Sequence, residues 1–198
     1  MTWVFVLVGV GLVVLVAIGV VVIIYNGLVR ARNAYRNSFG QIDVQLTRRH
    51  DLIPNLVETA KGYLRHERGT LEVVVRARTA AVSAQSAVAG KAGTGAALGV
   101  LAGAENLLTQ ALGQMFALAE GYPDLKANQS MLRLQEELTT TENRVAFARQ
   151  AYNDAVMTYN TKRQVFPSSL IAGIFSFRPA ELFEIDDPLQ RQAPDVSF

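Results

Sequence analysis

Histidines and carboxylates are the side chains of this 198-residue sequence whose chemistry suits metal binding or proton transfer. The two histidines, His50 and His66, form no H-E-x-x-H motif and no close cluster with the spacing of metal ligands. Glu136 and Glu137 are adjacent in sequence, and side chains one residue apart on a helix point in different directions. The sequence therefore predicts no metal site and no pair of catalytic carboxylates.

Motifs for the other common chemistries are missing as well. The sequence has no cysteine, no G-x-S-x-G or S-x-x-K motif and no Walker sequence, and its G-x-G at Gly93 to Gly95 follows no predicted strand. With 19 basic and 17 acidic residues the net charge is +2, and no basic groove for nucleic acid stands out. We therefore expect no enzyme activity, no catalytic residue, no cofactor and no nucleic-acid partner.

Two short polar segments have the most distinctive composition, and we interpret them as candidate interaction or structural motifs. The first contains Arg48, Arg49, Asp51, Pro54, Asn55 and Glu58, and the second contains Tyr122, Pro123, Asp124, Lys126 and Asn128. Asn128 suits the N-cap of a helix and Pro123 suits the turn before it, so a structural role would suffice for the second segment.

The elements that position these motifs are predicted to be helices. Between Ala127 and Phe166, apolar residues follow alternating steps of four and three, the heptad pattern of a bundle or coiled-coil helix. The pairs Tyr152-Asn153 and Tyr159-Asn160 lie seven residues apart on one face of this helix. We expect each tyrosine to pack in the apolar seam and each asparagine to form hydrogen bonds at its edge.

A membrane helix is predicted at the N-terminus. Trp3 to Tyr25 spans 23 uncharged, mostly apolar residues, which reach about 34 Å as a helix and suffice to cross a bilayer. A cleaved signal peptide fits poorly, because the run is long, follows no basic residue and ends without an A-x-A site. Arg30, Arg32 and Arg36 follow the run directly, so the positive-inside rule predicts an N-terminus outside and a cytoplasmic C-terminal domain.

We predict an all-α fold in which the N-terminal transmembrane helix continues into an elongated antiparallel four-helix bundle. The expected parts are a membrane anchor at 1–29, a cytoplasmic bundle at 30–166 with an Ala/Gly-rich connection at 83–104, and a membrane-proximal apolar segment with a flexible tail at 167–198.

The prolines and glycines predict where the chain reverses. Pro54 is expected to end the first bundle helix, because proline removes a hydrogen bond from a helix interior. The turns at 49–54 and 122–128 would then share the end distal to the membrane, with connection 83–104 and Pro167 at the membrane end. Arg78 occupies an apolar-seam position of the second helix and needs a partner if it is buried.

Residues 168–177 are apolar but too short to span a bilayer. The side chains that could contact the membrane interface or a neighbouring subunit are Leu170, Ile171, Ile174, Phe175 and Phe177. A cap over the base of the bundle is the alternative, and the apolar area involved does not distinguish the two.

The sequence resembles the LemA family of bacterial membrane proteins. The resemblance rests on Tyr25-Asn26, the Arg48 to Glu58 segment, His66-Glu67, the Tyr122 to Asn128 segment, Leu134-Gln135, Leu138, Glu142-Asn143, Ala148-Arg149, Tyr152-Asn153, Tyr159-Asn160, Phe166-Pro167 and Phe183-Glu184. It implies a single-pass protein of the inner membrane with an N-terminal anchor and a cytoplasmic four-helix domain. It implies no established biochemical activity.

Three functions are compatible with these features. The favoured one is a membrane-anchored scaffold or interaction protein that forms homo-oligomers in the lipid bilayer and binds other membrane or cytoplasmic proteins. The second is a sensor or signalling module that transmits a change along its continuous first helix. The third and least favoured is an enzyme subunit.

Overall fold

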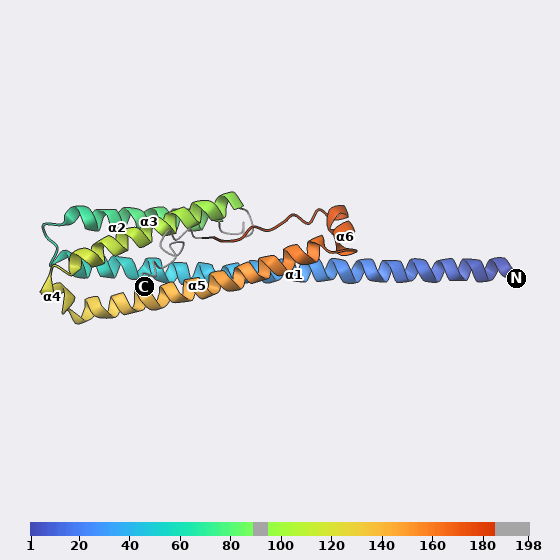
Figure 1. The fold of residues 1–198 in the computed structure, drawn as a ribbon, viewed down its shortest axis with the longest axis horizontal. Coiled ribbons are helices and arrows are strands. Elements are labelled where there is room, and N and C mark those ends of the chain that lie inside the picture. The colour runs from blue at the N-terminus through green and yellow to red at the C-terminus, as the bar shows by residue number, and fades with distance from the viewer. Residues whose placement is uncertain (89–94, 185–198) are drawn as a thin grey trace, which may run out of the picture.

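The computed structural model describes residues 1–88 and 95–184, and six helices lie within them. They are α1 (Thr2–Lys61), α2 (Arg68–Val88), α3 (Gly95–Ala119), α4 (Pro123–Lys126), α5 (Gln129–Gln164) and α6 (Ser168–Ile174). Helices α1, α2, α3 and α5 form an elongated antiparallel bundle, and α1 projects alone beyond it toward the N-terminus (Figure 1). The predicted all-α architecture is confirmed.

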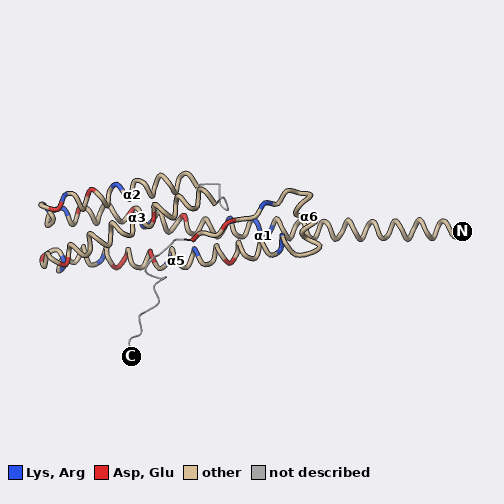
Figure 2. Tube along the Cα trace, turned by 45° about the horizontal axis from the view of Figure 1, so that its top comes forward, with Lys and Arg blue, Asp and Glu red and all other residues tan. Residues whose placement is uncertain are grey.

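The projecting part of α1 is the apolar segment predicted to cross the membrane, and we call it the membrane segment. Among the described residues, α1 is the one helix long and apolar enough to cross a membrane. Residues 1–20 are all exposed, and no charged side chain interrupts the trace before Arg30 (Figure 2). An apolar surface of this size is stable in lipid and not in water. The helix then continues without a break into the bundle, as predicted.

Pro54 lies inside α1 and does not end it, so the turn predicted at 49–54 is wrong. Proline at position 54 deprives the carbonyl of His50 of its usual N–H donor one turn later. Arg78 of α2 donates from Nε to this carbonyl at 2.7 Å and replaces the missing donor. The helix therefore continues to Lys61, and the first reversal lies at residues 62–67.

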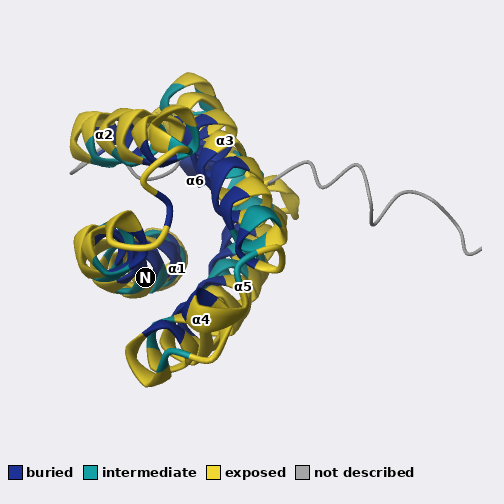
Figure 3. Cartoon of the chain, turned by 90° about the vertical axis from the view of Figure 1, so that its left-hand side faces the viewer, coloured by how far each residue is buried: buried dark blue, intermediate teal, exposed yellow. Residues whose placement is uncertain are grey.

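The core of the bundle includes the seam predicted for α5 and one face of α1. Leu28, Ala31, Tyr35, Phe39, Ile42 and Leu46 of α1 are buried, and α5 contributes Met131, Leu138, Thr141, Val145, Tyr152, Val156 and Tyr159. The ring of Tyr35 lies 5.1 Å from that of Tyr159, between centroids, and Phe39 contacts Tyr152 at 5.7 Å. Seen along the bundle, the buried faces of the helices turn toward one another (Figure 3).

Most of the predicted connection at 83–104 is helical. Helix α2 continues to Val88 and α3 begins at Gly95, while residues 89–94 lie outside the described part of the chain. Ala84, Val88, Leu98 and Leu101 are buried between the two helices, so packing compensates for the weak helix propensity of the glycines. The α2–α3 hairpin is directed toward the membrane end but stops short of α6 (Figure 1).

Candidate functional site

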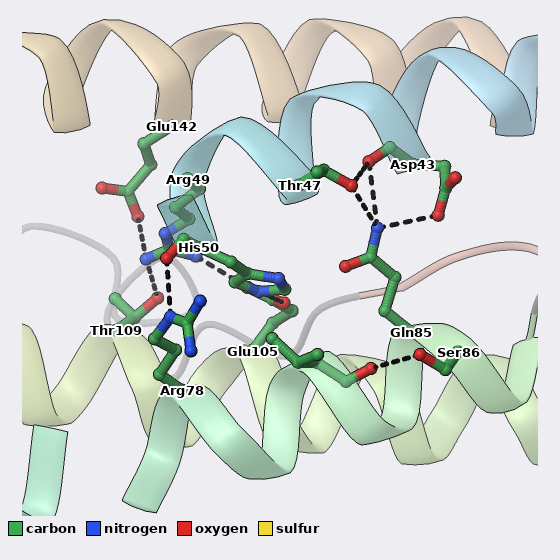
Figure 4. A network of polar contacts seen from close by, with 11 residues as sticks. Asp43, Thr47, Arg49, His50, Arg78, Gln85, Ser86, Glu105, Thr109 and Glu142 are labelled. Atoms are coloured by element: carbon green, nitrogen blue, oxygen red, sulfur yellow. Dashed lines mark hydrogen bonds and ion pairs between the residues drawn. The ribbon is translucent and has the colours of Figure 1, made fainter. Parts of the chain in front are cut away.

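A buried polar network at the middle of the bundle is the strongest candidate site (Figure 4). Arg49 of α1 donates from Nη1 to Oε2 of Glu105 on α3 at 3.0 Å. Nε2 of His50 lies 2.8 Å from the other carboxylate oxygen of Glu105. The Arg49, His50 and Glu105 side chains are 6%, 2% and 1% exposed, so water cannot screen these contacts. We call Arg49, His50 and Glu105, with Thr109, Glu142 and Arg78, the buried network.

The remaining members connect all four long helices. Arg49 donates from Nη2 to Oγ1 of Thr109 on α3 at 2.9 Å, and the same nitrogen lies 3.7 Å from Glu142 of α5. Arg78 of α2 adds its bond to the His50 carbonyl. Because each bond has a partner on another helix, the network fixes the register of α1 against α2, α3 and α5.

One ring nitrogen of His50 forms no hydrogen bond to the described residues. Its Nδ1 atom is buried and has no hydrogen-bond partner among the described residues. His50 lines a groove of about 300 Å³ between α1 and α2, together with Asp43, Asp51, Arg78, Gln85 and Ser86. Gln85 closes one side of the groove by donating to Oδ1 of Asp43 at 2.8 Å. In a catalytic triad, a carboxylate orients a histidine that activates a nucleophilic hydroxyl. Glu105 and His50 reproduce the first contact, but among the described residues no hydroxyl is hydrogen-bonded to Nδ1 of His50.

The structure separates the residues of the first predicted motif. Arg49 belongs to the buried network, whereas the other members occupy exposed faces of α1, and these are Arg48, Asp51, Pro54, Asn55 and Glu58. Sequence analysis missed Glu105, which supplies the counter-charge. The available signal was that Glu105 is the one charged residue of α3, a helix in which most other residues are apolar or small. A lone carboxylate at such a position requires a buried partner.

The second predicted motif lies at the distal end, as expected. Asn128 is the N-cap of α5, and its Oδ1 accepts from the backbone N–H groups of Ser130 and Met131 at 2.9 and 3.1 Å. Its Nδ2 donates to the Tyr63 hydroxyl at 3.1 Å, so this turn meets the reversal after α1. The other members form the short α4 and its flanks: Tyr122, Pro123, Asp124 and Lys126, the last paired with Glu120.

The two Tyr-Asn pairs of α5 bind the backbone of a C-terminal segment, residues 178–184. Asn160 pairs with both backbone groups of Ala180, at 2.7 and 3.0 Å, and Asn153 pairs with those of Phe183, at 3.3 and 2.8 Å. Tyr159 and Tyr152 donate to the carbonyls of Arg178 and Glu181 at 2.7 and 2.9 Å. Seven helical residues and three extended residues each span about 10 Å, so the two repeats match.

This C-terminal segment was counted with the flexible tail in the sequence analysis. It runs back from α6 along α5 and lies against the start of α3, where Glu181 meets Gly95. Ala180 and Phe183 are buried. The segment therefore covers the part of α5 that the shorter α2–α3 hairpin leaves open. Residues 185–198, the rest of the expected tail, lie outside the described residues.

The predicted interface residues of 168–177 divide into two groups. Ile171 and Phe177 are buried against the bundle, whereas Leu170, Ile174 and Phe175 are 60%, 74% and 50% exposed. The ring of Phe175 contacts that of Tyr25 at 4.9 Å, near the end of the membrane segment. Helix α6 thus caps the base of the bundle with one face and leaves an apolar face free beside α1.

Comparison with known proteins identifies the family of the chain. The chain is 27% identical over 175 residues to magnetosome protein MamQ 2 of Paramagnetospirillum magneticum, a match that covers 81% of this chain and 64% of that protein. It is 25% identical over 174 residues to magnetosome protein MamQ of Magnetospirillum gryphiswaldense, with 80% and 64% covered. The chain thus spans less than two thirds of the length of these relatives. A sequence model of the LemA family matches residues 38–198, and the chain belongs to the LemA family.

Proposed function

We propose that this protein is a membrane-anchored scaffold that presents its helical bundle to other proteins and associates with further copies of itself. The observation that carries the proposal is the continuity of α1, a 60-residue helix that contains both the membrane segment and the central helix of the bundle. Such a helix holds the distal end of the bundle at a defined distance from the bilayer. The orientation expected from Arg30, Arg32 and Arg36 puts the bundle in the cytoplasm, at the inner membrane.

A groove at the distal end of the bundle offers a contact surface for partner proteins, and this supports the proposal. Val57, Leu64, Leu71 and Val75 provide its apolar part, and Lys61, Arg65, Arg68, Glu72 and Arg76 surround them. The volume of the groove is about 640 Å³. An apolar centre with a basic rim suits an amphipathic segment that carries acidic residues.

Photo-crosslinking in native membranes tests this function. A photoreactive phenylalanine at Val75 should form specific protein adducts, whereas the same residue at the exposed Gln150 of α5 should form few. In purified protein in lipid nanodiscs, an adduct of twice the chain mass from Val75 would support self-association. Equal yields from both positions would contradict a partner surface at the distal groove.

A sensor is the second candidate, because the helix that crosses the membrane also carries Arg49 and His50 of the buried network. A displacement of α1 would therefore strain contacts to three other helices. A flexible linker inserted after Arg30 separates the two functions. If the protein is a scaffold, the variant with the linker should still form its Val75 adducts. If it is a sensor, perturbing the membrane should change the adducts of the wild type but not those of the variant.

A further inference from the structure

Six basic side chains surround the end of the bundle next to the membrane, and we call them the basic collar. They are Arg30, Arg32 and Arg36 of α1, Lys162 and Arg163 of α5, and Arg178 of the C-terminal segment. No aspartate or glutamate occurs in residues 1–42 or 155–180. Among the described residues, no member of the basic collar forms an ion pair. The described residues thus concentrate positive charge here without a counter-charge.

With Tyr25 at the membrane interface, the nearest member of the basic collar, Arg30, would reach the lipid headgroups. Tyr25 ends the apolar run of α1, and its ring contacts those of Phe175 and Phe177 at 4.9 and 5.6 Å. The Arg32 guanidinium lies 5.2 Å from the centre of the Phe177 ring. At about 1.5 Å per residue, Arg30 is roughly 8 Å beyond Tyr25, at the outer edge of the headgroup layer, where a long side chain reaches phosphates.

Apolar side chains at the same level are exposed. They are Val165, Phe166, Leu170, Ile174 and Phe175, with exposed fractions from 49% to 79%. They belong to the turn between α5 and α6, to α6 itself and to the residue after it, all beside the point where α1 leaves the bundle (Figure 1). This surface lies next to the apolar surface of the membrane segment of α1, in which residues 1–20 are all exposed.

A polar groove opens between the end of α5 and α6. Arg163, Ser169, Ser176 and Arg178 line its polar part, and its volume is about 600 Å³. The Nε atoms of Arg32 and Arg163 are buried and have no hydrogen-bond partner among the described residues. Two guanidinium groups and two hydroxyls without a carboxylate form a donor set that suits a phosphate.

Three arginines of the basic collar act on the same buried side chain, Tyr159. Burial and the neighbouring Tyr35 raise the pKa of Tyr159, while the positive charges of Arg163, Arg32 and Arg36 act in the opposite direction. Arginines from two helices therefore act on a single buried phenol. The same field attracts anions to the surface around it.

We propose that the membrane end of the bundle is a binding site for anionic phospholipid. The exposed apolar side chains of α6 and its flanks insert at the acyl boundary, and the basic collar binds headgroup phosphates, one of them in the groove between Arg163 and Arg178. A second copy of the chain fits this surface less well, because it would bring an identical basic collar against the first. Amphipathic surfaces with apolar and basic faces bind anionic leaflets by this combination.

Lipid photolabelling of the full-length protein tests the proposal. The protein is reconstituted in phosphatidylcholine nanodiscs that contain a trace of diazirine-bearing phosphatidylglycerol or, in parallel, diazirine-bearing phosphatidylcholine. We expect the phosphatidylglycerol probe to label peptides of residues 162–178 several-fold more than the phosphatidylcholine probe, with a preference that falls as salt is raised. Equal labelling by both probes would overturn the anionic preference, and labelling by neither would overturn the membrane contact.

Paired variants assign the effect to the basic collar. R163Q/R178Q should reduce the affinity for phosphatidylglycerol by roughly fivefold per charge removed. The control R133Q/R144Q neutralises two exposed arginines of the same helix α5 far from the membrane and should leave labelling unchanged. Equal effects of the two double variants would show a general charge effect and refute the site.

The apolar component is tested by L170S/I174S, since both side chains are largely exposed. We expect weaker labelling by both probes and an unchanged melting temperature. A markedly lower melting temperature would show that these residues belong to the core. Retained lipid labelling in this variant, together with a crosslink between two chains from a photoreactive phenylalanine placed at Leu170 in the otherwise wild-type protein, would assign the surface to subunit contact and overturn the proposal.

Discussion

The buried network and the basic collar both depend on arginine, but they balance its charge in different ways. In the buried network, Arg49 faces the Glu105 carboxylate at 3.0 Å and Glu142 at 3.7 Å. In the basic collar, no cation has a carboxylate partner among the described residues. A buried charge without a partner costs several kcal/mol, so the bundle must supply its own anion at Arg49. At the membrane end no described residue supplies such an anion, and we propose that a lipid phosphate does so.

The largest expected effect comes from breaking the balance of the buried network. Glu105→Ala should lower the free energy of unfolding by about 3–5 kcal/mol, because Arg49 and His50 would remain buried without their carboxylate. Glu142→Ala is the matched control, since this side chain is 54% exposed and contacts the same arginine. It should cost less than about 1 kcal/mol. Urea unfolding of the detergent-solubilised protein, followed by circular dichroism, measures both; similar costs would contradict a buried ion pair.

The C-terminal segment, residues 178–184, is held to α5 by neutral amide and phenol side chains and not by ion pairs. Asn160→Ala removes both hydrogen bonds to Ala180 and should cost about 1–3 kcal/mol. Asn143→Ala, at an exposed position of α5, should have almost no effect. Limited chymotrypsin digestion should cleave at Phe183 faster in the first variant only. Unchanged cleavage in Asn160→Ala would mean that the remaining tyrosine and Asn153 contacts suffice to hold the segment.

The third prediction concerns the bond between Arg78 and the carbonyl that Pro54 leaves unpaired. Arg78→Met should destabilise the wild-type protein by about 1–2 kcal/mol. In the Pro54→Ala background residue 54 regains an N–H group, which can donate to His50, so the same substitution should cost less. A double-mutant cycle measures the difference, and we expect a coupling of about 1 kcal/mol. Additive effects would show that Arg78 does not replace the lost helix bond.

Much of the fold could be predicted from local patterns. The heptads predicted the buried seam of α5, because a helical period is visible in the sequence wherever one face is buried. Asn128 was predicted as an N-cap for the same reason: a cap depends on residues two and three positions ahead. These features need no knowledge of the rest of the chain.

The features that were missed depend on contacts between distant residues. Pro54 was interpreted as a helix end, since its compensating donor belongs to another helix. Glu105 acquires its role from Arg49 and His50; its isolation as the one charged residue of α3 indicates a buried partner but does not identify these two residues. The Tyr-Asn pairs were placed on the correct face, but the segment that they bind could not be inferred from their spacing alone.

The smallest effect on stability is expected at Tyr159, a core residue close to the cations of the basic collar. Burial is the main cause that raises the pKa of Tyr159 above 10.0, so the folded state favours the neutral phenol. The stabilising contribution of the neutral phenol is therefore complete below pH 10.0 and is lost as the pH rises through the higher pKa of the folded state. Its hydroxyl also donates to the Arg178 carbonyl at 2.7 Å, and ionisation removes that donor.

Tyr159→Phe separates these contributions. At pH 7 the variant should lose about 0.5–1.5 kcal/mol, the usual value of one neutral hydrogen bond. Above pH 10 wild type should lose stability more steeply than the variant, because phenylalanine cannot ionise, and the gap between the two should narrow. Unfolding at a series of pH values measures both slopes. If the slopes are parallel through the alkaline range, the phenol ionises equally well in the folded and unfolded states, and the field of the basic collar at Tyr159 offsets the whole cost of its burial.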